Sequence, residues 1–357
     1  MRGVANLMTA ARAPSALRLH VGTYAHAGGK GLYPLDYDGS GGWELGQPYR
    51  SASNASFGAF SPHHDCYYLV DEQEDGALGS HKNGSGGWKA LASVTTGGAA
   101  PCYVALENGG KRVAVANYES GSIALFSIDP ATGAALGDPL LHQHHGSGPN
   151  PDRQRGPHAH CVQFSSDGRW LYHVDLGTDQ ILAFPTGADA SLADPHIAYA
   201  APPGSGPRHL LLGPEGRAFL VSELASTLTV LAEENGVFRE RHRLSTLPSR
   251  HEGQNLGGHI AMNSTGNRVY VSNRGHDSIA VFDLTDDRPT LIHHIPSGGA
   301  SPRFFLLIEE HRRLAIANEE AGNVVIVALK GDAAPTHEAT IAIPGAAFIL
   351  RENIAPR

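Results

Sequence analysis

One short segment of the chain, residues 146–184, concentrates the side chains that could do chemistry. A polar stretch, DRQR at residues 152–155, leads directly into His158 and His160. Because alternate side chains of a strand share one face, the two histidines are expected to point the same way at a strand entrance. Imidazole changes its charge near neutral pH and can move protons. The segment therefore predicts a pocket with binding or acid–base chemistry.

Additional histidines precede this segment, at positions 142, 144 and 145. Neutral imidazole is a common metal ligand, so a metal site is one interpretation of this cluster. The spacing lies on a loop and gives no clear ligand set, so a polar lid is the simpler interpretation. The sequence thus predicts neither a metal nor a cofactor. The insertion at residues 129–157 is expected to lie over one mouth of a channel.

The whole chain, including this segment, repeats a single structural unit about every 45 to 58 residues, a period typical of propellers and solenoids. Each copy has an entry strand, a turn, an apolar strand that ends on a polar residue, a second turn and another apolar strand. Runs such as RVAVAN, RVYVSN and RLAIAN predict strands, because they are apolar, often β-branched and bounded by turn residues. The residues that close the apolar strand are Thr23, Asp71, Asn117, Asp175, Glu223, Asn273 and Asn318.

Seven copies predict an all-β fold, a seven-bladed β-propeller. A lone four-stranded blade cannot bury its apolar faces, whereas a closed ring of blades can. The predicted domain covers residues 18–357, after a loose N-terminal tail at residues 1–17. The last strand-like run, near the C-terminus, is expected to complete the blade opened by the N-terminal strand and so close the ring.

Composition agrees with this architecture and excludes some functions. The 357 residues include 43 Gly and 23 Pro, and only 17% are charged, as expected for many short strands and tight turns. A net charge of −8 argues against nucleic acid or an anionic membrane as a partner. Three separated cysteines are expected to be buried thiols, which favours the cytoplasm. The sequence leaves the oligomeric state open, as a monomer or dimer.

Four motifs carry a resemblance to a known family: RQRGPHAH, GPRHL, SEL and SNRGHDSIAVF. They resemble the propeller-type lactonases, the family of bacterial 6-phosphogluconolactonase and the fungal carboxymuconate-lactonising enzyme, and the similarity covers essentially the whole chain. The resemblance implies a site at the mouth of the central channel, formed by a His, two Arg and a Glu. The matching residues are His158 or His160, Arg208, Glu223 and Arg274; we favour His160 because of its distance from the turn.

Opening a lactone requires a base that activates water, a donor for the oxyanion and a proton for the ring oxygen. Arginine stays protonated but presents a fixed fork of donors, so Arg208 and Arg274 are assigned to substrate and transition-state charge. His160 and Glu223 are the candidates for proton transfer. Glu223 could equally orient a guanidinium, or tie turn amides in the slot that Asp or Asn fills in other blades.

Other residues are candidates for substrate binding. Arg303, in an SPR motif parallel to GPR, adds positive charge, while Arg153 and Gln154 could close over the substrate and His158 lies beside His160. Structural alternatives remain open, namely packed histidines, blade-locking arginines and a solvated loop.

The predicted function is metal-independent hydrolysis of a small-molecule sugar lactone that carries a negative group, with 6-phosphogluconolactone as the leading substrate. The alternatives are an aldonic or aldaric acid lactone, a muconate-lactonising reaction, and a non-enzymatic scaffold for protein partners.

Overall fold

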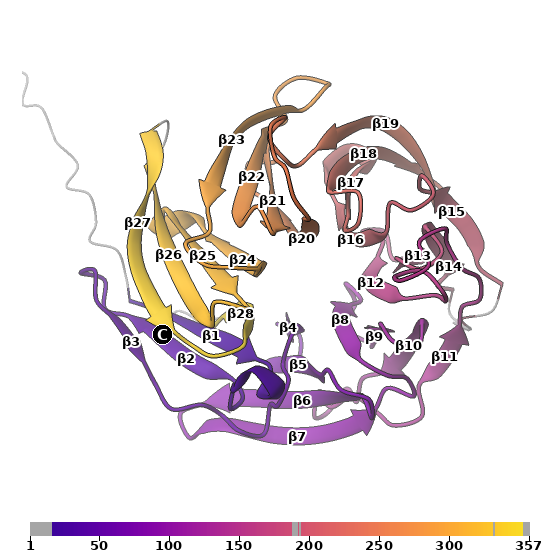
Figure 1. Cartoon of the computed structure of the whole chain (residues 1–357). Helices are drawn as coiled ribbons and strands as arrows, with labels where there is room; N and C mark the ends of the chain where they lie inside the picture. Colours follow the sequence, from indigo (N-terminus) through magenta and orange to yellow (C-terminus); the bar gives the residue numbers. More distant parts are fainter. Residues whose placement is uncertain (1–15, 188–191, 193, 331–332, 353–357) are drawn as a thin grey trace, which may run out of the picture.

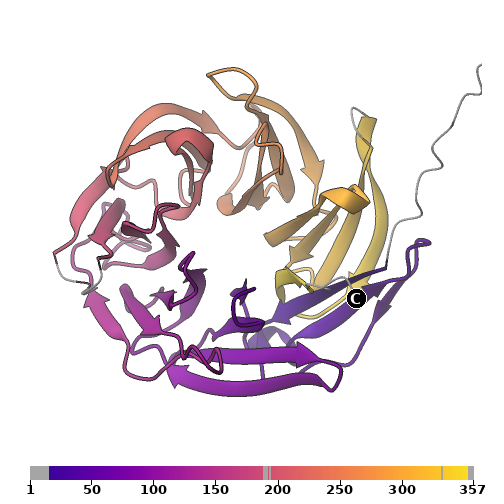
Figure 2. The same ribbon diagram turned by 180° about the vertical axis from the view of Figure 1, so that it is seen from behind.

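The computed structural model describes residues 16–187, 192, 194–330 and 333–352. Seven four-stranded antiparallel sheets are arranged in a closed ring, which Figures 1 and 2 show from opposite sides. This confirms the predicted seven-bladed β-propeller. The blades are numbered here in chain order, and each is given from its innermost to its outermost strand.

The strands of the first four blades alternate in direction and are joined mainly by short turns. The first blade contains β28 (Ala346–Arg351), β1 (Leu17–Thr23), β2 (Tyr33–Tyr37) and β3 (Trp43–Leu45). The second contains β4 (Gly58–Ser61), β5 (Cys66–Asp71), β6 (Ala77–Gly84) and β7 (Gly87–Thr95). The third contains β8 (Pro101–Leu106), β9 (Arg112–Asn117), β10 (Ser122–Ser127) and β11 (Leu140–Gln143). The fourth contains β12 (Ala159–Phe164), β13 (Trp170–Asp175), β14 (Gln180–Pro185) and β15 (His196–Ala200).

The remaining blades follow the same plan. The fifth contains β16 (Pro207–Leu212), β17 (Arg217–Ser222), β18 (Thr227–Glu234) and β19 (Val237–Ser245). The sixth contains β20 (Leu256–Met262), β21 (Arg268–Arg274), β22 (Ser278–Asp283) and β23 (Thr290–Pro296). The seventh contains β24 (Pro302–Ile308), β25 (Arg313–Asn318), β26 (Asn323–Lys330) and β27 (Ala333–Ala342). Three short 3₁₀ turns complete the described elements: η1 (Ala25–Ala27), η2 (Pro214–Gly216) and η3 (Glu309–His311).

The two ends of the chain close the ring within the first blade. β28 pairs with β1 in antiparallel register, with Val21 opposite Ile349, so the last strand is the innermost strand of that blade. The predicted closure is confirmed. β1 begins at Leu17, which is buried, so the propeller starts one residue before the predicted boundary. Residues 1–15 of the predicted tail and residues 353–357 of the predicted domain lie outside the described residues.

The core lies between blades. Alternate residues of β5 show why: Tyr67 and Leu69 pack in a cluster with the first blade, whereas Tyr68 and Val70 pack in a cluster with the third. A middle strand therefore buries both faces, which explains its continuous apolar sequence.

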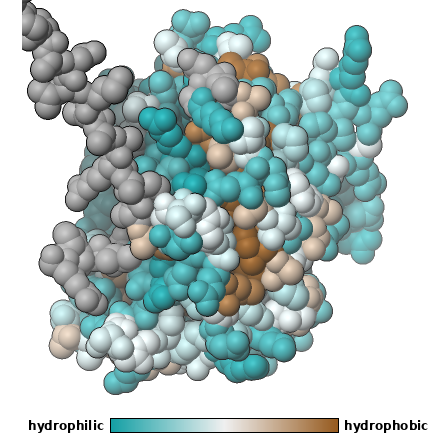
Figure 3. Space-filling model, turned by 90° about the vertical axis from the view of Figure 1, so that its left-hand side faces the viewer, coloured by the Kyte–Doolittle hydropathy of each residue, from teal (hydrophilic) through white to brown (hydrophobic). Residues whose placement is uncertain are grey.

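The outer wall is polar. Figure 3 shows the side of the ring that carries β3 and β27, where hydrophobic residues form a band within a mostly hydrophilic surface. The large exposed hydrophobic residues belong mainly to outermost strands of several blades: Leu45, Leu136, Leu140, Leu141, Ile197, Val237 and Ile292. Cys66, Cys102 and Cys161 are buried and free. Within the described residues, no helix has the length and apolar character needed to cross a membrane.

In three blades, the residue that closes the second strand fastens the blade to its neighbour. In each of them the Asn side chain donates to a carbonyl of the preceding connection, for example from Nδ2 of Asn273 to O of Thr246 at 2.9 Å. Asn117 bonds Thr96 O and Asn318 bonds Ser297 O in the same way. These polar residues thus satisfy buried backbone groups where blades meet.

The prediction that Glu223 fills this slot is wrong by one residue. In the fifth blade Ser222 pairs with Pro207, as Asn117 pairs with Pro101 in the third. Glu223 follows the slot, and its carboxylate does not tie turn amides. Ser222 is less distinctive than Asn or Asp, which is why the sequence repeat was aligned on Glu223.

Candidate active site

Seven residues, one from each blade, form a ring at one mouth of the channel. Each comes directly after the strand-closing residue, and its backbone lies beside the start of the innermost strand. The N–H of Glu223 donates to Gly206 O and that of Glu319 to Ser301 O, while Arg274 pairs with Leu256. The ring consists of Tyr24, Glu72, Tyr118, Leu176, Glu223, Arg274 and Glu319.

Bulges in the innermost strands supply a second set of side chains. Five of these strands skip one residue at the same place in their pairing with the next strand. A bulge leaves the extra residue unpaired and re-aims its side chain, and bulges are common beside active sites. The skipped residues are Cys102, His160, Arg208, Arg303 and Ala347, and the first four bear side chains that could take part in chemistry.

Glu223 is the centre of the first charge cluster. Its Oε1 lies 2.6 Å from Nη2 of Arg153, and its Oε2 lies 2.7 Å from Nη2 of Arg274 and 3.1 Å from Nε of Arg208. Burial opposes the charge of this carboxylate, but the guanidinium of Arg274 and its other partners hold the pKa of Glu223 well below its usual range. Glu223 is therefore an ionised group that organises three arginines.

His160 contacts the same carboxylate. Its Nε2 lies 3.5 Å from Oε2 of Glu223, and its Nδ1 lies 3.6 Å from Sγ of Cys102. Burial, followed by the charge of Arg208, lowers the pKa of His160 to about 4. The ring is thus neutral at neutral pH, with both nitrogens facing protein groups.

Arg208 lies beneath the pocket. Its Nη1 lies 2.8 Å from Gly258 O and 2.8 Å from Nε2 of His209. Burial, followed by the charge of Arg274, lowers the pKa of Arg208 to about 10. The side chain is 3% exposed, so it acts on the site through Glu223.

Arg303 is the centre of a second cluster. Its Nη1 lies 3.4 Å from Oε2 of Glu319, and its Nη2 lies 3.7 Å from Oε1 of Glu72. The Tyr24 hydroxyl donates to Oε2 of Glu72 at 2.7 Å, and the guanidinium carbon of Arg303 lies 5.2 Å from the centre of the Tyr24 ring. One guanidinium is thus shared by two carboxylates.

Tyr118 brings the two predicted histidines together. The ring of His158 stacks on Tyr118 with centroids 4.5 Å apart, and the ring of His160 meets it edge-on at 5.0 Å. Nη2 of Arg153 donates to the Tyr118 hydroxyl at 3.1 Å. His158 precedes β12 and lies within hydrogen-bonding distance of Tyr118 O, so it packs at the edge of the site.

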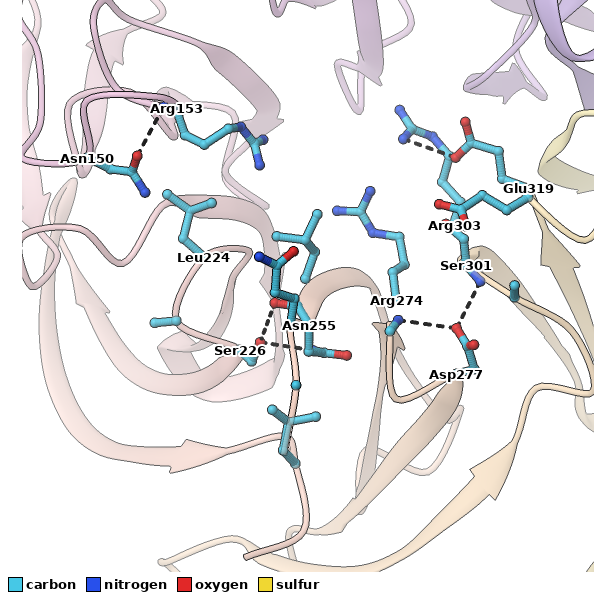
Figure 4. A pocket seen from close by; sticks show the side chains of 18 residues that line it. Asn150, Arg153, Leu224, Ser226, Asn255, Arg274, Asp277, Ser301, Arg303 and Glu319 are labelled. Carbon is cyan, nitrogen blue, oxygen red and sulfur yellow. Dashed lines mark hydrogen bonds and ion pairs between the residues drawn. The ribbon is translucent and has the colours of Figure 1, made fainter. Parts of the chain in front are cut away.

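A pocket of about 940 Å³ opens above these clusters. In Figure 4 the guanidinium groups of Arg153, Arg274 and Arg303 converge on its open space from different blades. Arg274 is 10% exposed, and its Nε has no hydrogen-bond partner in the described part of the chain. Further wall residues are Asn150, Leu224, Ser226, Asn255, Asp277, Ser301 and Glu319.

Gln154 has a different position from the one expected. It is fully buried, its Nε2 donates to Leu176 O at 2.8 Å, and its Oε1 accepts from the N–H of Asn150 at 3.1 Å. The side chain fixes the loop that carries Arg153. It does not line the pocket.

The histidine-rich segment was expected to be a loop, but His142 belongs to β11, and the segment packs against the fourth blade. The ring of His142 meets Phe184 edge-on, and His144 lies within hydrogen-bonding distance of Thr178. The described residues contain no group of three or more His, Cys, Asp or Glu suited to holding a metal ion.

Six aromatic or imidazole rings pack across the channel beneath the charged mouth. The rings of Phe57 and Tyr103 stack at 4.1 Å, as do those of His259 and Phe304. His209 and Phe348 complete the layer, which consists of side chains at the start of innermost strands. The charged groups therefore lie between an apolar floor and the open pocket.

The predicted residues His160, Arg208, Glu223 and Arg274 converge, and Arg153 joins them. Arg303 lies in the same pocket but in its own cluster. Sequence reasoning missed the residues of the ring and bulge positions that lack a family motif: Tyr24, Glu72, Cys102, Tyr118 and Glu319. Tyr24, Glu72, Tyr118 and Glu319 each directly follow a strand-closing residue, and Cys102 has the same place in β8 that Arg208 has in β16. These two repeat positions are the signal that could have identified them.

Comparisons with known proteins agree with this geometry. The family model described as "Lactonase, 7-bladed beta-propeller" matches residues 18–349. The chain is 30% identical to 6-phosphogluconolactonase of Bacillus subtilis, over 86% of this chain and 89% of that protein. It is also 30% identical to a 6-phosphogluconolactonase of Formosa agariphila, over 84% and 88%. The structure of the periplasmic gluconolactonase PpgL of Pseudomonas aeruginosa superposes with a TM-score of 0.87 and 25% identity, over 96% of this chain and 100% of that one.

Proposed function

Because this chain belongs to the seven-bladed β-propeller lactonase family and is a lactone hydrolase, we propose that it opens the lactone of a sugar acid carrying a negative group. The leading substrate is 6-phosphogluconolactone, which would yield 6-phosphogluconate. Two relatives at 30% identity bear the name of that activity.

The observation that carries the proposal is the state of Arg274. Its side chain is 10% exposed and lines the pocket, and its Nη2 is fixed by Oε2 of Glu223 and by Gly257 O. A fixed donor beside an open pocket suits the oxygen of a lactone carbonyl, on which negative charge develops during attack by water. Arg153, fixed by Glu223 and Tyr118, provides a second positive charge at the same side.

Glu223 and His160 support this arrangement without contacting the pocket. Glu223 fixes the directions of three guanidinium groups before substrate arrives, so little reorganisation is needed during the reaction. His160 faces that ionised carboxylate as a neutral imidazole, and its Nε2 can only donate to it. Of the two roles left open for Glu223, the geometry favours orientation over proton transfer.

A second candidate is the lactone of an unphosphorylated aldonic or aldaric acid. Of the three arginines expected to cradle a phosphate, Arg208 is buried under Glu223 and Arg303 is shared by two carboxylates. That leaves Arg274, which Arg153 joins from the loop before β12, and these two would suffice for a carbonyl and one anionic group. The lactonising reaction on a muconate would use the same donors in the reverse direction.

The scaffold alternative predicts a broad apolar docking face. Most of the exposed large hydrophobic residues lie on outermost strands of different blades, at the outer wall. The charged pocket at the channel mouth favours a small polar substrate instead.

Purified protein incubated with freshly prepared 6-phosphogluconolactone, gluconolactone, an aldaric lactone and a muconolactone tests the proposal. Acid release followed at constant pH should exceed spontaneous opening for at least one sugar lactone. The ratio of kcat/KM for the phosphorylated and unphosphorylated gluconolactones decides between the first two candidates. No acceleration with any lactone would refute the proposed substrate class.

A further inference from the structure

Lactone hydrolysis needs a group that removes a proton from water, and both candidates in the first cluster are already occupied. Glu223 accepts from Arg153 at Oε1 and from Arg274 at Oε2. His160 faces Glu223 with Nε2 and Cys102 with Nδ1, and its side chain is 6% exposed. Neither residue lines the pocket. A general base must reach the water through a free lone pair, so the base belongs elsewhere in the pocket.

Among the described residues, three carboxylates line the pocket: Asp277, Glu319 and Glu320. Oδ1 of Asp277 accepts from the N–H groups of Gly275 and Ser301, so Asp277 fastens two connections of the site. Glu320 is exposed at the rim and takes part in none of the hydrogen bonds of the site. Glu319 is the carboxylate that belongs to the ring of residues at the channel mouth and is held there by a guanidinium group.

Its backbone and side chain fix Glu319 at the mouth. It is a member of the ring, with its N–H donated to Ser301 O at 2.9 Å. Oε2 lies 3.4 Å from Nη1 of Arg303, whereas Oε1 has no hydrogen-bond partner in the described part of the chain. The side chain is 20% exposed. Figure 4 shows Glu319 beside Arg303, with Arg274 between this pair and Arg153.

We propose that Glu319 is the general base of this enzyme, a role that rests on the proposed lactone hydrolysis. Oε1 takes a proton from water while the water oxygen bonds to the lactone carbonyl carbon. The electron pair of the C=O bond moves to oxygen, where Arg274 and Arg153 stabilise the negative charge.

The intermediate then collapses by breaking the bond between that carbon and the ring oxygen. The protonated Glu319 returns the proton to the departing oxygen, which becomes a hydroxyl group. The new carboxylic acid loses a proton to solvent. Lactone and water thus yield a hydroxy-carboxylate and one proton, and the enzyme regains its starting state.

Arg303 is a positioning residue in this scheme. Its guanidinium holds Oε2 of Glu319 and also faces Oε1 of Glu72, whose Oε2 is occupied by Tyr24. Arg303 therefore sets the direction of Oε1 of Glu319 without contacting the water. The two charge clusters then divide the work, with oxyanion stabilisation on one side of the pocket and proton removal on the other.

Glu319→Gln tests the proposal, because it keeps the shape of the side chain and removes its basicity. We expect kcat to fall about 10²- to 10³-fold with KM changed less than about threefold, as for loss of a general base. Glu234→Gln is the control, since it removes the same charge from an exposed residue of β18 outside the pocket, and we expect kcat within about twofold of wild type. In Glu319→Ala, added formate should restore at least about tenfold of the lost rate in a saturable way, because it supplies a carboxylate.

Circular dichroism and the thermal midpoint check that each variant folds. If Glu319→Gln does not fold, Glu319→Asp keeps the charge but withdraws the carboxylate by one carbon, and kcat should still fall about tenfold or more. Unchanged turnover in a folded Glu319 variant, or an equal loss in Glu234→Gln, overturns the proposal. If the wild-type protein hydrolyses lactones and Glu319→Gln is fully active, the role of Glu319 is refuted and the proposed function stands. An inactive wild type refutes the proposed function, and this role with it.

Discussion

The two charge clusters at the channel mouth have inverse compositions. In one, the carboxylate of Glu223 is shared by the guanidinium groups of Arg153, Arg208 and Arg274. In the other, the guanidinium of Arg303 is shared by two carboxylates. Ring and bulge positions of the same repeat supply most of both clusters. The fold therefore fixes where a side chain lies, and the residue identity at each position decides whether that side of the pocket attracts negative or positive charge.

The largest expected effect follows from the buried centre of the positive cluster. Replacing Glu223 with Gln leaves three guanidinium groups without their shared carboxylate, and we expect the free energy of unfolding to fall by about 3–5 kcal/mol. Urea denaturation measures this loss. Glu234→Gln, at an exposed end of the same blade, should change stability by less than about 0.5 kcal/mol. A loss below about 1 kcal/mol in Glu223→Gln would show that the cluster does not depend on this charge.

Arg274→Met should have the next largest effect, on the reaction. Removing one donor from an oxyanion site lowers kcat by about 10²- to 10³-fold. Steady-state kinetics with the best lactone measure it, with Arg288→Met on an exposed turn of the same blade as control. Full turnover in Arg274→Met would remove this residue from the site.

Arg303→Met should have a smaller effect, because Arg303 positions a carboxylate and does not contact the reacting atoms. We expect kcat to fall about tenfold, as for a moderate misplacement of a catalytic group. Arg303→Lys keeps the charge and should recover part of the rate. If Arg303→Met is as inactive as Arg274→Met, both arginines contact the reacting atoms. The two clusters then do not have separate roles in oxyanion stabilisation and proton removal.

The smallest expected effect concerns pH and His160. Burial, followed by Arg208, lowers the pKa of His160 from 6.5 to about 4. As pH falls below 6.5 the unfolded chain binds a proton that the folded protein does not, so the folded state loses stability. This residue should contribute a loss of about 1 kcal/mol between pH 7 and 5.5. Urea denaturation at both pH values should show a smaller difference for His160→Gln, and an identical difference in both proteins would contradict a neutral His160.

The sequence was sufficient to predict the blades because each repeat carries polar residues with a structural task. Asn273 and Asn318 fasten neighbouring blades, so they recur at the same position and mark the period. Closure of the ring could be predicted because the last strand-like run near the C-terminus belongs to none of the seven repeats as a separate copy. In the fifth blade the strand-closing position was assigned to Glu223, because Ser222, which occupies it, is less distinctive than Asn or Asp.

The site was only partly predictable. The resemblance to lactonases pointed to Arg208, Glu223 and Arg274, and the structure brings them together. Glu319 was missed because a Glu after Asn318 looks like any polar turn residue until the ring position is known. Gln154 shows the opposite error, because it was predicted to bind substrate and is buried. The residues around a glutamine in a loop do not reveal whether its amide is buried or exposed.

The pairing of β28 with β1 has a consequence for synthesis of the protein. Val21 meets Ile349 only after nearly the whole chain has left the ribosome, so the first blade waits with an open inner edge while the other six are made. An unpaired edge invites pairing with other chains. Closure of the ring therefore waits for β28, and mutations in that strand should reduce the yield of native protein more than equally buried mutations in a central blade.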